Sequence, residues 1–216
     1  MKNKNAEQQR RRMYDVPDVP VEKKPFYSIV KRIFDICASL SALCICILPM
    51  VIVGIIIKCD SKGPVIYKQE RLGKNGKPFM LYKFRSMYID AESEGAKWAA
   101  ENDTRCTRVG KFLRKSRLDE LPQFVNILFG QMSFVGPRPE RPFFYGEFEK
   151  VIHGFSHRLK VTPGLTGLAQ VNGGYDLLPE EKIVFDMQYI QNRSLWLDIK
   201  CILKTVLIVF NHDGAR

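Results

Sequence analysis

The longest hydrophobic pattern in the chain is an uncharged run from Ile36 to Ile57. A run of roughly 18 or more apolar residues is typical of a helix that spans a membrane. However, Pro49 lies inside this run, where a proline removes a backbone donor and crowds the preceding turn. The run therefore spans a membrane, enters and leaves it on one side, or forms a helix in a soluble core.

The charges on either side of the run favour one of these three topologies. Basic residues flank it at both ends: Lys31, Arg32, Lys58 and Lys62. Positive flanks mark the cytoplasmic side of a membrane, so both ends are expected on that side. The arm before Pro49, Ile36–Leu48, reaches only about 20 Å as a helix, which is shorter than the ~30 Å hydrocarbon core. The pattern predicts a re-entrant helix broken at Pro49, with a spanning helix and a soluble core helix as alternatives.

This helix divides the chain into three predicted parts. Residues 1–28 are predicted to be a flexible basic tail that contains Arg10, Arg11 and Arg12. The tail is either a solvated disordered arm or a segment that holds anionic lipid headgroups. Residues 29–58 form the re-entrant membrane helix, and residues 59–216 form a domain on the cytoplasmic side.

A β-hairpin is predicted after the membrane helix. Asn75-Gly76 lies between the strand-like stretches VIYKQERL and PFMLYKFRSM, and this dipeptide is a strong signal for a hairpin turn. Alternation along the second strand places four side chains on one face: Phe79, Leu81, Lys83 and Arg85. Lys83 and Arg85 are then either a solvated strand end or a pair that contacts phosphate.

Asp119 and Glu120 form an adjacent acid pair within a basic stretch. The surrounding cations are Lys111, Arg114, Lys115, Arg117 and, further on, Arg138. Pro122 is suited to the first turn of a helix that stops at Gly130, so the pair lies at or just before a helix N-terminus. Carboxylates at this position commonly cap the helix. Alternatively, because adjacent side chains point about 100° apart on a helical turn, one carboxylate can attack while the other holds a metal.

Two further helices are predicted in the last third of the chain. Pro179 opens the first, and Ser194 is suited to cap a second that runs from Leu195 to Phe210. One face of the second helix is apolar and consists of Leu195, Ile199, Ile202, Leu203, Val206 and Phe210. This face either packs against the domain core or lies in the lipid headgroup layer, with Trp196 as an interfacial residue.

Composition narrows the class of partner. The 216 residues carry a net charge of +11, which favours an anionic partner such as a phospholipid surface, a nucleic acid or a phosphorylated substrate. The six cysteines form no CxxC pair and the three histidines complete no zinc spacing, so buried reduced thiols are favoured over a structural zinc site. The patterns together predict an α+β, mostly helical, membrane-monotopic domain with a re-entrant N-terminal helix, one β-hairpin and amphipathic interfacial helices.

Longer stretches carry a resemblance to a known family. From about Lys31 to the C-terminus the chain contains, in this order, KRIFDI, YKFRSM, LRKSRLDELPQFVNILFGQMSFVGPRPE, TPGLTGLAQVNG and SLWLDIKCILKTV. Together they resemble the bacterial sugar transferase family, the small monotopic phosphoglycosyl transferases that begin glycan assembly on a polyprenyl phosphate. Pro49 matches the proline that breaks the re-entrant helix of that family.

The resemblance implies an activity and roles for individual residues. The family transfers a sugar 1-phosphate from a nucleotide diphosphosugar, expected here to be a UDP-sugar, to undecaprenyl phosphate and releases UMP. It implies that Asp119 is the nucleophile, which forms an acyl phosphate, and that Glu120 is a ligand of the required Mg²⁺. The expected substrate contacts are Lys83, Arg85, Arg114, Arg138, Gln170 and Asn172. Residues 59–216 are then the cytoplasmic catalytic domain.

The expected partners follow from the same resemblance. They are the nucleotide-sugar donor, the polyprenyl phosphate acceptor and a phospholipid membrane, with no nucleic acid, at the cytoplasmic face of the cytoplasmic membrane. Phosphoryl transfer requires in-line positioning and neutralisation of oxygen charge more than acid–base catalysis, which fits an acid pair among cations. The competing hypothesis is a membrane-anchored basic module that binds nucleic acid or acidic lipid without catalysis. The Asp119–Glu120 pair among the cations weakens it, because such a module needs no acid pair.

Overall fold

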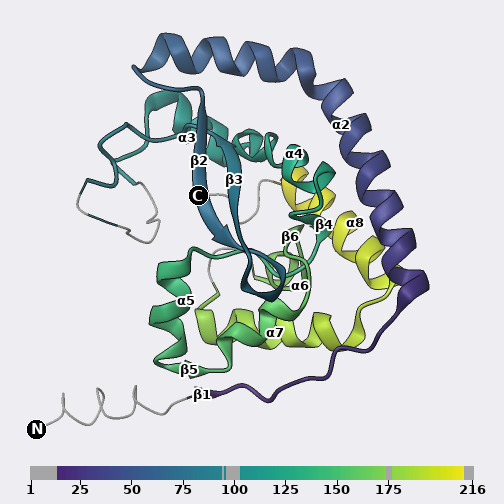
Figure 1. The fold of residues 1–216 in the computed structure, drawn as a ribbon. Helices are drawn as coiled ribbons and strands as arrows, with labels where there is room; N and C mark the ends of the chain where they lie inside the picture. Colours follow the sequence, from purple (N-terminus) through teal and green to yellow (C-terminus); the bar gives the residue numbers. More distant parts are fainter. Residues whose placement is uncertain (1–13, 94, 96–102, 174–176, 212–216) are drawn as a thin grey trace, which may run out of the picture.

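Helices make up most of the structure, and one is much longer than the others (Figure 1). The computed structural model describes residues 14–93, 95, 103–173 and 177–211. The helices are α2 (Pro25–Asp60), α3 (Arg108–Lys115), α4 (Gln123–Leu128), α5 (Pro142–Glu149), α6 (Leu168–Asn172), α7 (Pro179–Asn192) and α8 (Leu195–Asn211). Short 3₁₀ segments accompany them: η1 (Lys74–Gly76), η2 (Leu118–Glu120) and η3 (Phe155–Lys160). The predicted mostly helical fold with few strands is confirmed.

The strands of the described residues form three separate two-stranded sheets. β2 (Ile66–Leu72) pairs antiparallel with β3 (Pro78–Phe84), β1 (Tyr14–Asp15) pairs parallel with β5 (Ile152–His153), and β4 (Ser133–Val135) pairs parallel with β6 (Gly164–Thr166). The parallel pairs join segments that are distant in sequence, because a parallel pair needs a crossover connection. Only the antiparallel pair was predicted.

The predicted hairpin is confirmed, with its turn at Asn75-Gly76. Asn75 has φ 57° and Gly76 has φ 72°, a left-handed backbone that asparagine and glycine adopt most readily. Phe79 is buried in the core, as the alternation of side chains along the strand predicts. The alternation ends at Phe84 and Arg85, because these two adjacent residues are both buried. Arg85 therefore leaves the face that it was predicted to share with the rest of the strand.

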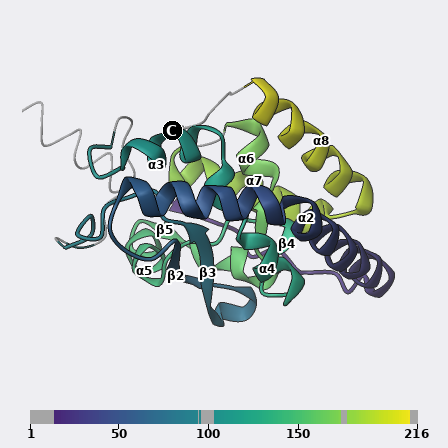
Figure 2. The same cartoon turned by 90° about the horizontal axis from the view of Figure 1, so that it is seen from above.

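α2 is one continuous helix that bends, rather than two separate arms (Figure 1). It begins at Pro25, before the predicted start at residue 29, because a proline in the first helical turn has no N–H that needs a partner. The first part of α2 runs along α4 and α8, and the second part turns across α3, as seen from above in Figure 2. Pro49 lies inside the helix, and a proline is a common cause of a sharp helix bend.

Much of the uncharged run in α2 is exposed, although both parts of the helix contact the domain. Asp35 and Ser39 are buried in the first part, and Val53 and Ile57 are buried against Phe84 in the second. By length and composition α2 could cross a membrane, and only 17% of its apolar window is buried. Such an exposed apolar helix fits association with a membrane.

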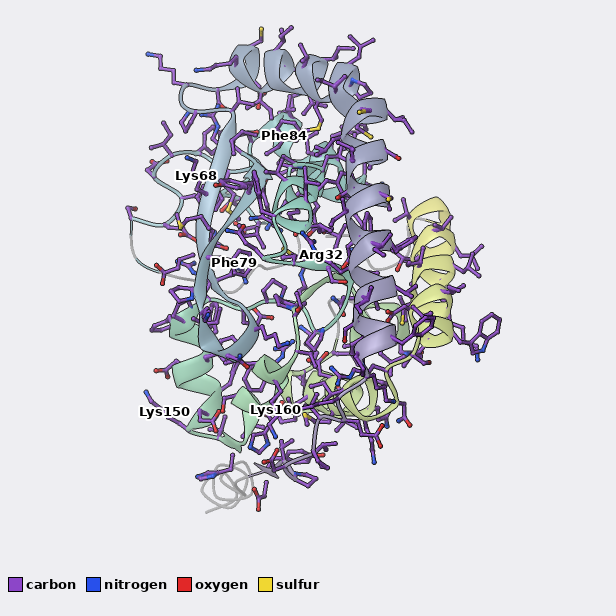
Figure 3. The ribbon with its side chains drawn as sticks, turned by 45° about the vertical axis from the view of Figure 1, so that its right-hand side comes forward. Arg32, Lys68, Phe79, Phe84, Lys150 and Lys160 are labelled. Atoms are coloured by element: carbon purple, nitrogen blue, oxygen red, sulfur yellow. The ribbon has the colours of Figure 1, made fainter. Side chains whose placement is uncertain are left out.

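Arg32 connects α2 to the end of α4 (Figure 3). Its guanidinium donates to the carbonyl oxygens of Ile127 and Leu128, both at 2.7 Å. The last carbonyls of a helix have no partner within the helix, and a cation there also interacts favourably with the helix dipole. α4 ends at Leu128, and Gly130, which has φ 78°, follows two residues later, close to the predicted stop. The contacts of Arg32 tie α2 to an element of the site described below.

The chain before α2 differs from the flexible tail that was predicted for residues 1–28. Residues 14–24 run along the domain, where β1 pairs with β5. Val16 is buried in the main core, and Val19 and Val21 pack against the same core. The apolar surface of these valines outweighs the prolines and charges that favoured a tail. Residues 1–13 of the predicted tail lie outside the described residues.

The main core lies beneath α7 and α8, which begin at the predicted positions. Ser194 Oγ accepts a hydrogen bond from the backbone N–H of Leu197 at 3.2 Å, as expected for a cap. α8 packs by the side that contains Cys201. For the predicted apolar face, core packing and the headgroup layer were the two alternatives, and three of its residues are exposed: Ile199, Leu203 and Val206. Trp196 is also 63% exposed, so α8 presents a second apolar face to its surroundings.

Candidate active site

Asp119 and Glu120 lie in η2, immediately before α4, as predicted. Arg117 precedes them with φ 57°, so the chain turns sharply between α3 and the acid pair. Pro122 is the N-cap residue of α4, and no side chain makes a cap hydrogen bond in this fully described segment. The structure therefore gives no support to the alternative that the acid pair caps the helix.

Glu120 is held by two cations from different elements. Lys83 Nζ, on β3, donates to Oε1 of Glu120 at 3.2 Å, and Arg138 Nη2, in the loop after β4, donates to the same oxygen. Burial opposes the ionisation of Glu120, but Arg138 and Lys83 together outweigh it and hold the pKa of Glu120 below its usual range. Glu120 is therefore ionised at neutral pH.

Asp119 has a different electrostatic environment, although it is the adjacent residue. It is only 6% exposed. Burial raises the pKa of Asp119 to about 6, the charge of Lys83 opposes this rise, and the negative charge of Glu120 adds to it. Asp119 also lines a cavity, so a bound molecule can reach its carboxyl group. The two neighbouring carboxyls thus differ in how readily each takes up a proton.

The cavity beside Asp119 is strongly basic. Its volume of about 430 Å³ lies within the range of small-molecule ligand pockets. The cations in its lining are Arg71, Lys83, Arg85, Arg105, Arg114, Arg117, Arg138, Arg141, Arg158 and Lys182. The acids in its lining are Glu92, Asp119 and Glu140. With ten cations against three acids, the cavity is suited to a ligand that carries several negative charges.

Five of the six predicted substrate contacts line this cavity. They are Lys83, Arg85, Arg114, Arg138 and Gln170. Arg114 Nη1 also donates to Cys106 Sγ at 3.0 Å, which fixes one end of the guanidinium. The sequence-based choice of residues therefore agrees with the location of the cavity, with Arg85 and Asn172 as the two exceptions described next.

Arg85 lines the cavity, but its guanidinium is occupied inside the protein. It donates to the backbone oxygens of Ser61 at 2.6 Å, Lys62 at 2.7 Å and Ile57 at 3.4 Å. These carbonyls lie at the C-terminal end of α2, where a helix leaves its last acceptors without partners. The structure therefore places Arg85 as a clamp on the end of α2 rather than as a free contact for phosphate.

Asn172 does not reach the cavity. Asn172 and Gln170 lie two positions apart on α6, so their side chains point about 200° apart around the helix. Gln170 lines the cavity, whereas Asn172 is exposed, donates to Leu168 O at 2.8 Å and accepts from Lys204 Nζ at 3.3 Å. Asn172 therefore lies outside the lining of the cavity, and its contact with the substrate stays a prediction.

Close backbone packing fixes the turn that carries Arg138. Gly136 N donates to Thr166 O, and Gly164 N donates to Pro137 O, both at 2.9 Å. A Cβ atom on Gly164 would lie 2.1 Å from Gly136 N, so only glycine allows this approach. The GPRP and TPGLTG stretches are distant in sequence but form one part of the site for this reason.

Two ion pairs beside the cavity were not predicted. Arg71 Nη1 lies 3.2 Å from Glu140 Oε2, and Arg158 Nη2 lies 2.7 Å from Asp186 Oδ2. Burial raises the pKa of Asp186 to about 6, against the opposing effect of Arg158. Each pair joins segments that are distant in sequence, so no local pattern could have indicated it.

The acid pair also offers a carboxylate for magnesium. The described residues contain no group of three or more His, Cys, Asp or Glu that could hold a metal ion on its own. Mg²⁺, however, commonly binds through one or two carboxylates together with substrate phosphates and water. Glu120 fits this pattern, because Lys83 and Arg138 keep it ionised while donating to only one of its two carboxylate oxygens, Oε1.

Comparison with known proteins agrees with this arrangement. A model of the bacterial sugar transferase family matches residues 26–212. The chain is 44% identical over 195 residues to a UDP-N-acetylgalactosamine-undecaprenyl-phosphate N-acetylgalactosaminephosphotransferase of Aeromonas hydrophila, which covers 89% of this chain and 46% of that protein. It is 45% identical over 209 residues to a UDP-glucose:undecaprenyl-phosphate glucose-1-phosphate transferase of Klebsiella pneumoniae, with coverage of 93% and 45%. The chain thus spans about half the length of these curated relatives.

The family match extends over all the elements that form the site. It includes α2, the Asp119–Glu120 pair, the turn that carries Arg138, and the helix that carries Gln170. With a family match over most of its length, the chain belongs to the bacterial sugar transferase family.

Proposed function

We propose that this chain transfers a sugar 1-phosphate from a UDP-sugar to undecaprenyl phosphate and releases UMP. The names of the two relatives describe this general reaction for two different sugars. The observation that carries the proposal is the acid pair beside the cationic cavity: Asp119 lines the cavity, and Lys83 and Arg138 hold the adjacent Glu120 ionised. The excess of cations suits the diphosphate of a nucleotide sugar.

The proposed first step is attack by Asp119 on the phosphorus that carries the sugar. A bond forms between an oxygen of Asp119 and this phosphorus, and the bond from phosphorus to the bridging oxygen breaks. UMP leaves with that oxygen and the electron pair, and the sugar phosphate remains on Asp119 as an acyl phosphate. Lys83, Arg114 and Arg138 neutralise the phosphate oxygens during the transfer.

The proposed second step transfers the sugar phosphate to the lipid. An oxygen of undecaprenyl phosphate attacks the same phosphorus, and Asp119 departs as a carboxylate. The product is an undecaprenyl diphosphosugar, and Asp119 is again ready for a donor. The reaction needs no histidine base, because both attacking groups are already anions above a pH of about 6.

Magnesium is part of the proposal, with Glu120 as its protein ligand. When bound, Mg²⁺ would neutralise charge on the donor diphosphate. The contribution of the protein is to keep Glu120 ionised through Lys83 and Arg138 and to leave the remaining coordination positions to phosphate and water.

The proposed location is the cytoplasmic face of the cytoplasmic membrane, with residues 59–216 as the catalytic domain. α2 supports this, because it is long, apolar and mostly exposed and would bring the cavity close to a lipid acceptor. The re-entrant path is supported by the bend of α2 and by the packing of residues 14–24 on the same domain that follows α2. The competing basic module that binds nucleic acid or lipid without catalysis leaves the buried Asp119 without a role.

Release of UMP tests the proposed function. Purified protein is incubated with Mg²⁺, undecaprenyl phosphate and, in turn, UDP-N-acetylgalactosamine, UDP-glucose and UDP-galactose. At least one donor is expected to give UMP with multiple turnovers, and Glu120→Gln is expected to lose about 100-fold in rate, with part of the loss restored at high Mg²⁺. Lys150→Met is the matched control, because Lys150 is exposed and remote from the cavity (Figure 3). Absence of UMP with every donor would overturn the proposal.

A further inference from the structure

Arg138 has a central place in the site, because it joins Glu120 to the segment that contains Leu165. Its Nη2 donates to Glu120 Oε1, and its Nη1 makes a long hydrogen bond of 3.4 Å to Leu165 O. A shift of the Arg138 backbone would change the geometry of both contacts, or require the side chain to change its conformation to keep them. The contacts that hold this backbone therefore matter for the site.

A buried arginine holds the backbone of Arg138 from the side of the core. Arg158, on η3, donates from Nη2 to the carbonyl oxygen of Arg138 at 2.9 Å. The same Nη2 lies 2.7 Å from Oδ2 of Asp186, on α7. The guanidinium also lies over the ring of Phe155, 4.9 Å from its centroid. Arg158 is thus constrained from three directions at the point where it contacts the turn.

The pair of Arg158 and Asp186 is an unusual choice for stability alone. Their side chains are only 2% and 1% exposed. A fully buried ion pair loses hydration on both ions, and apolar residues of similar size often stabilise a fold equally well or better. Asp186 does not line the cavity, so it has no direct path to a ligand there. A role in holding Arg158 accounts for its burial.

We propose that Asp186 and Arg158 are positioning residues, which hold the backbone of Arg138 and, through Arg138, the carboxylate of Glu120. The series of contacts runs from α7 to η3, to the turn after β4, and then to η2. A displacement of about 1 Å in a reactive arrangement can cost about 100-fold in rate. This inference rests on one part of the proposed function, which is that Arg138 and Glu120 act on the nucleotide-sugar donor.

A double-mutant cycle tests whether Asp186 acts through Arg138. The rates of UMP release, as kcat/KM, are compared for Arg138→Ala, Asp186→Asn and the variant with both changes. Asp186→Asn is expected to lose about 100-fold, and the double variant is expected to equal Arg138→Ala within about twofold, because both changes disrupt one unit. Losses that multiply in the double variant would show that Asp186 acts independently and would overturn the inference.

A second variant keeps the test decisive if Asp186→Asn folds poorly. Arg158→Met combined with Asp186→Leu removes both buried charges and the donor to Arg138 O, and apolar replacement of a buried ion pair commonly preserves the fold. The matched control is Lys31→Met with Asp198→Leu, which removes another buried ion pair, between α2 and α8 at 2.7 Å. Only the first variant is expected to show the 100-fold loss. An equal loss in the control would mean general destabilisation and would overturn the inference.

Binding of UDP separates this inference from the proposed function. The dissociation constant of UDP in the presence of Mg²⁺ is measured by calorimetric titration for wild type, Arg138→Ala, Asp186→Asn and the double variant. The double variant is expected to bind UDP as weakly as Arg138→Ala does. If wild type binds UDP but releases UMP from no donor, the proposed function fails and the binding cycle alone decides the inference. If UDP does not bind wild type, or if Asp186→Asn binds UDP and turns over as wild type does, the inference is overturned.

Discussion

The adjacent residues Asp119 and Glu120 differ in protonation because each faces different neighbours. Glu120 contacts both Lys83 and Arg138, so their positive charges outweigh the effect of burial on its pKa. Asp119 is also buried, but the charge of Glu120 adds to the rise of its pKa. Pairs of titratable groups whose pKa values are pushed apart by their environment commonly divide the chemical roles of a site. This supports Asp119 as the group that reacts and Glu120 as the group that stays charged.

Asp119→Asn tests the covalent role directly. The substitution keeps the size of the side chain but replaces an attacking anion with a neutral amide, so the rate of UMP release is expected to fall by about 10⁴-fold or more. Intact mass is measured after incubation with UDP-sugar and Mg²⁺ but without undecaprenyl phosphate. Wild type is expected to gain the mass of one sugar phosphate, and Asp119→Asn is expected to gain none. A folded Asp119→Asn variant with turnover near that of wild type would refute the covalent role.

The dependence of rate on pH should follow the ionisation of the acid pair. In the proposed mechanism Asp119 attacks only as an anion. Its pKa is raised from 3.8 to about 6, so the rate is expected to increase with pH through about 6. Lys83 opposes the rise of this pKa. Lys83→Met should therefore move the midpoint to higher pH, in addition to lowering the rate. The measurement is kcat/KM for UMP release between pH 4.5 and 8.5, and a midpoint that stays near 6 in Lys83→Met would contradict the electrostatic explanation.

At the scale of elements, β3 and the residue that follows it supply two cations with different roles. Lys83 contacts Glu120 at the cavity, whereas Arg85 closes the end of α2 with three backbone acceptors. Arg85→Met should remove the Arg85 donor from the carbonyls of Ser61 and Lys62 and reduce the free energy of unfolding by about 3 kcal/mol. Lys83→Met should reduce the rate of UMP release with little change in stability. Thermal unfolding in detergent and UMP release are measured for both, and a stable but inactive Arg85→Met would restore Arg85 as a substrate contact.

Elements that depend on local sequence were predictable, and contacts between distant segments were not. The hairpin follows from Asn75-Gly76, and the position of the acid pair follows from Pro122 and Gly130, because each signal acts within a few residues. The pair of Arg158 and Asp186 depends instead on how η3 packs on α7. No periodicity within either segment encodes that contact.

Contacts between distant segments also explain where Asn172 and Arg85 lie, which the local sequence did not predict. The AQVNG stretch has no strong helix signal, so the short helix α6, which turns Asn172 away from Gln170, follows from its packing against α7 and α8. Arg85 was assigned by strand alternation, which ends where Phe84 enters a second core with Val53 of α2. In both places tertiary packing determines which way a side chain points.

At the scale of the whole molecule, both ends of α2 belong to one domain. Before α2, β1 pairs with β5, and Val16 is buried in the core that α7 and α8 cover. After α2, Arg85 clamps its last turn to β3. If α2 spanned a membrane, the residues before it would lie on the opposite side from β5. That arrangement would separate β1 from β5 and expose Val16, so the packing favours entry and return on one side.

Cysteine labelling tests this topology. Cysteines replace Lys23 and Lys74, which are exposed before and after α2. In this chain the exposed Cys37, Cys44 and Cys59 and the partly exposed Cys46 are changed to serine. A maleimide that does not cross membranes is expected to label both positions in inverted membrane vesicles and neither in intact spheroplasts.

The pattern of labelling identifies the cause as well as the topology. One result would contradict the same-side topology: labelling of Lys23→Cys in spheroplasts together with labelling of Lys74→Cys only in inverted vesicles. This result would show that α2 spans the membrane and that β1 does not pair with β5 in the membrane-bound protein.

Pro49→Ala in the same background separates the contribution of the proline from that of the packing. If the burial of Val16 and the β1–β5 pair hold the first part of α2 to the domain, Pro49→Ala should keep both positions on the cytoplasmic side and lower UMP release by distorting the bend. Transfer of Lys23→Cys to the outer side by this one substitution would show that the proline, and not the packing of residues 14–24, sets the path of the helix.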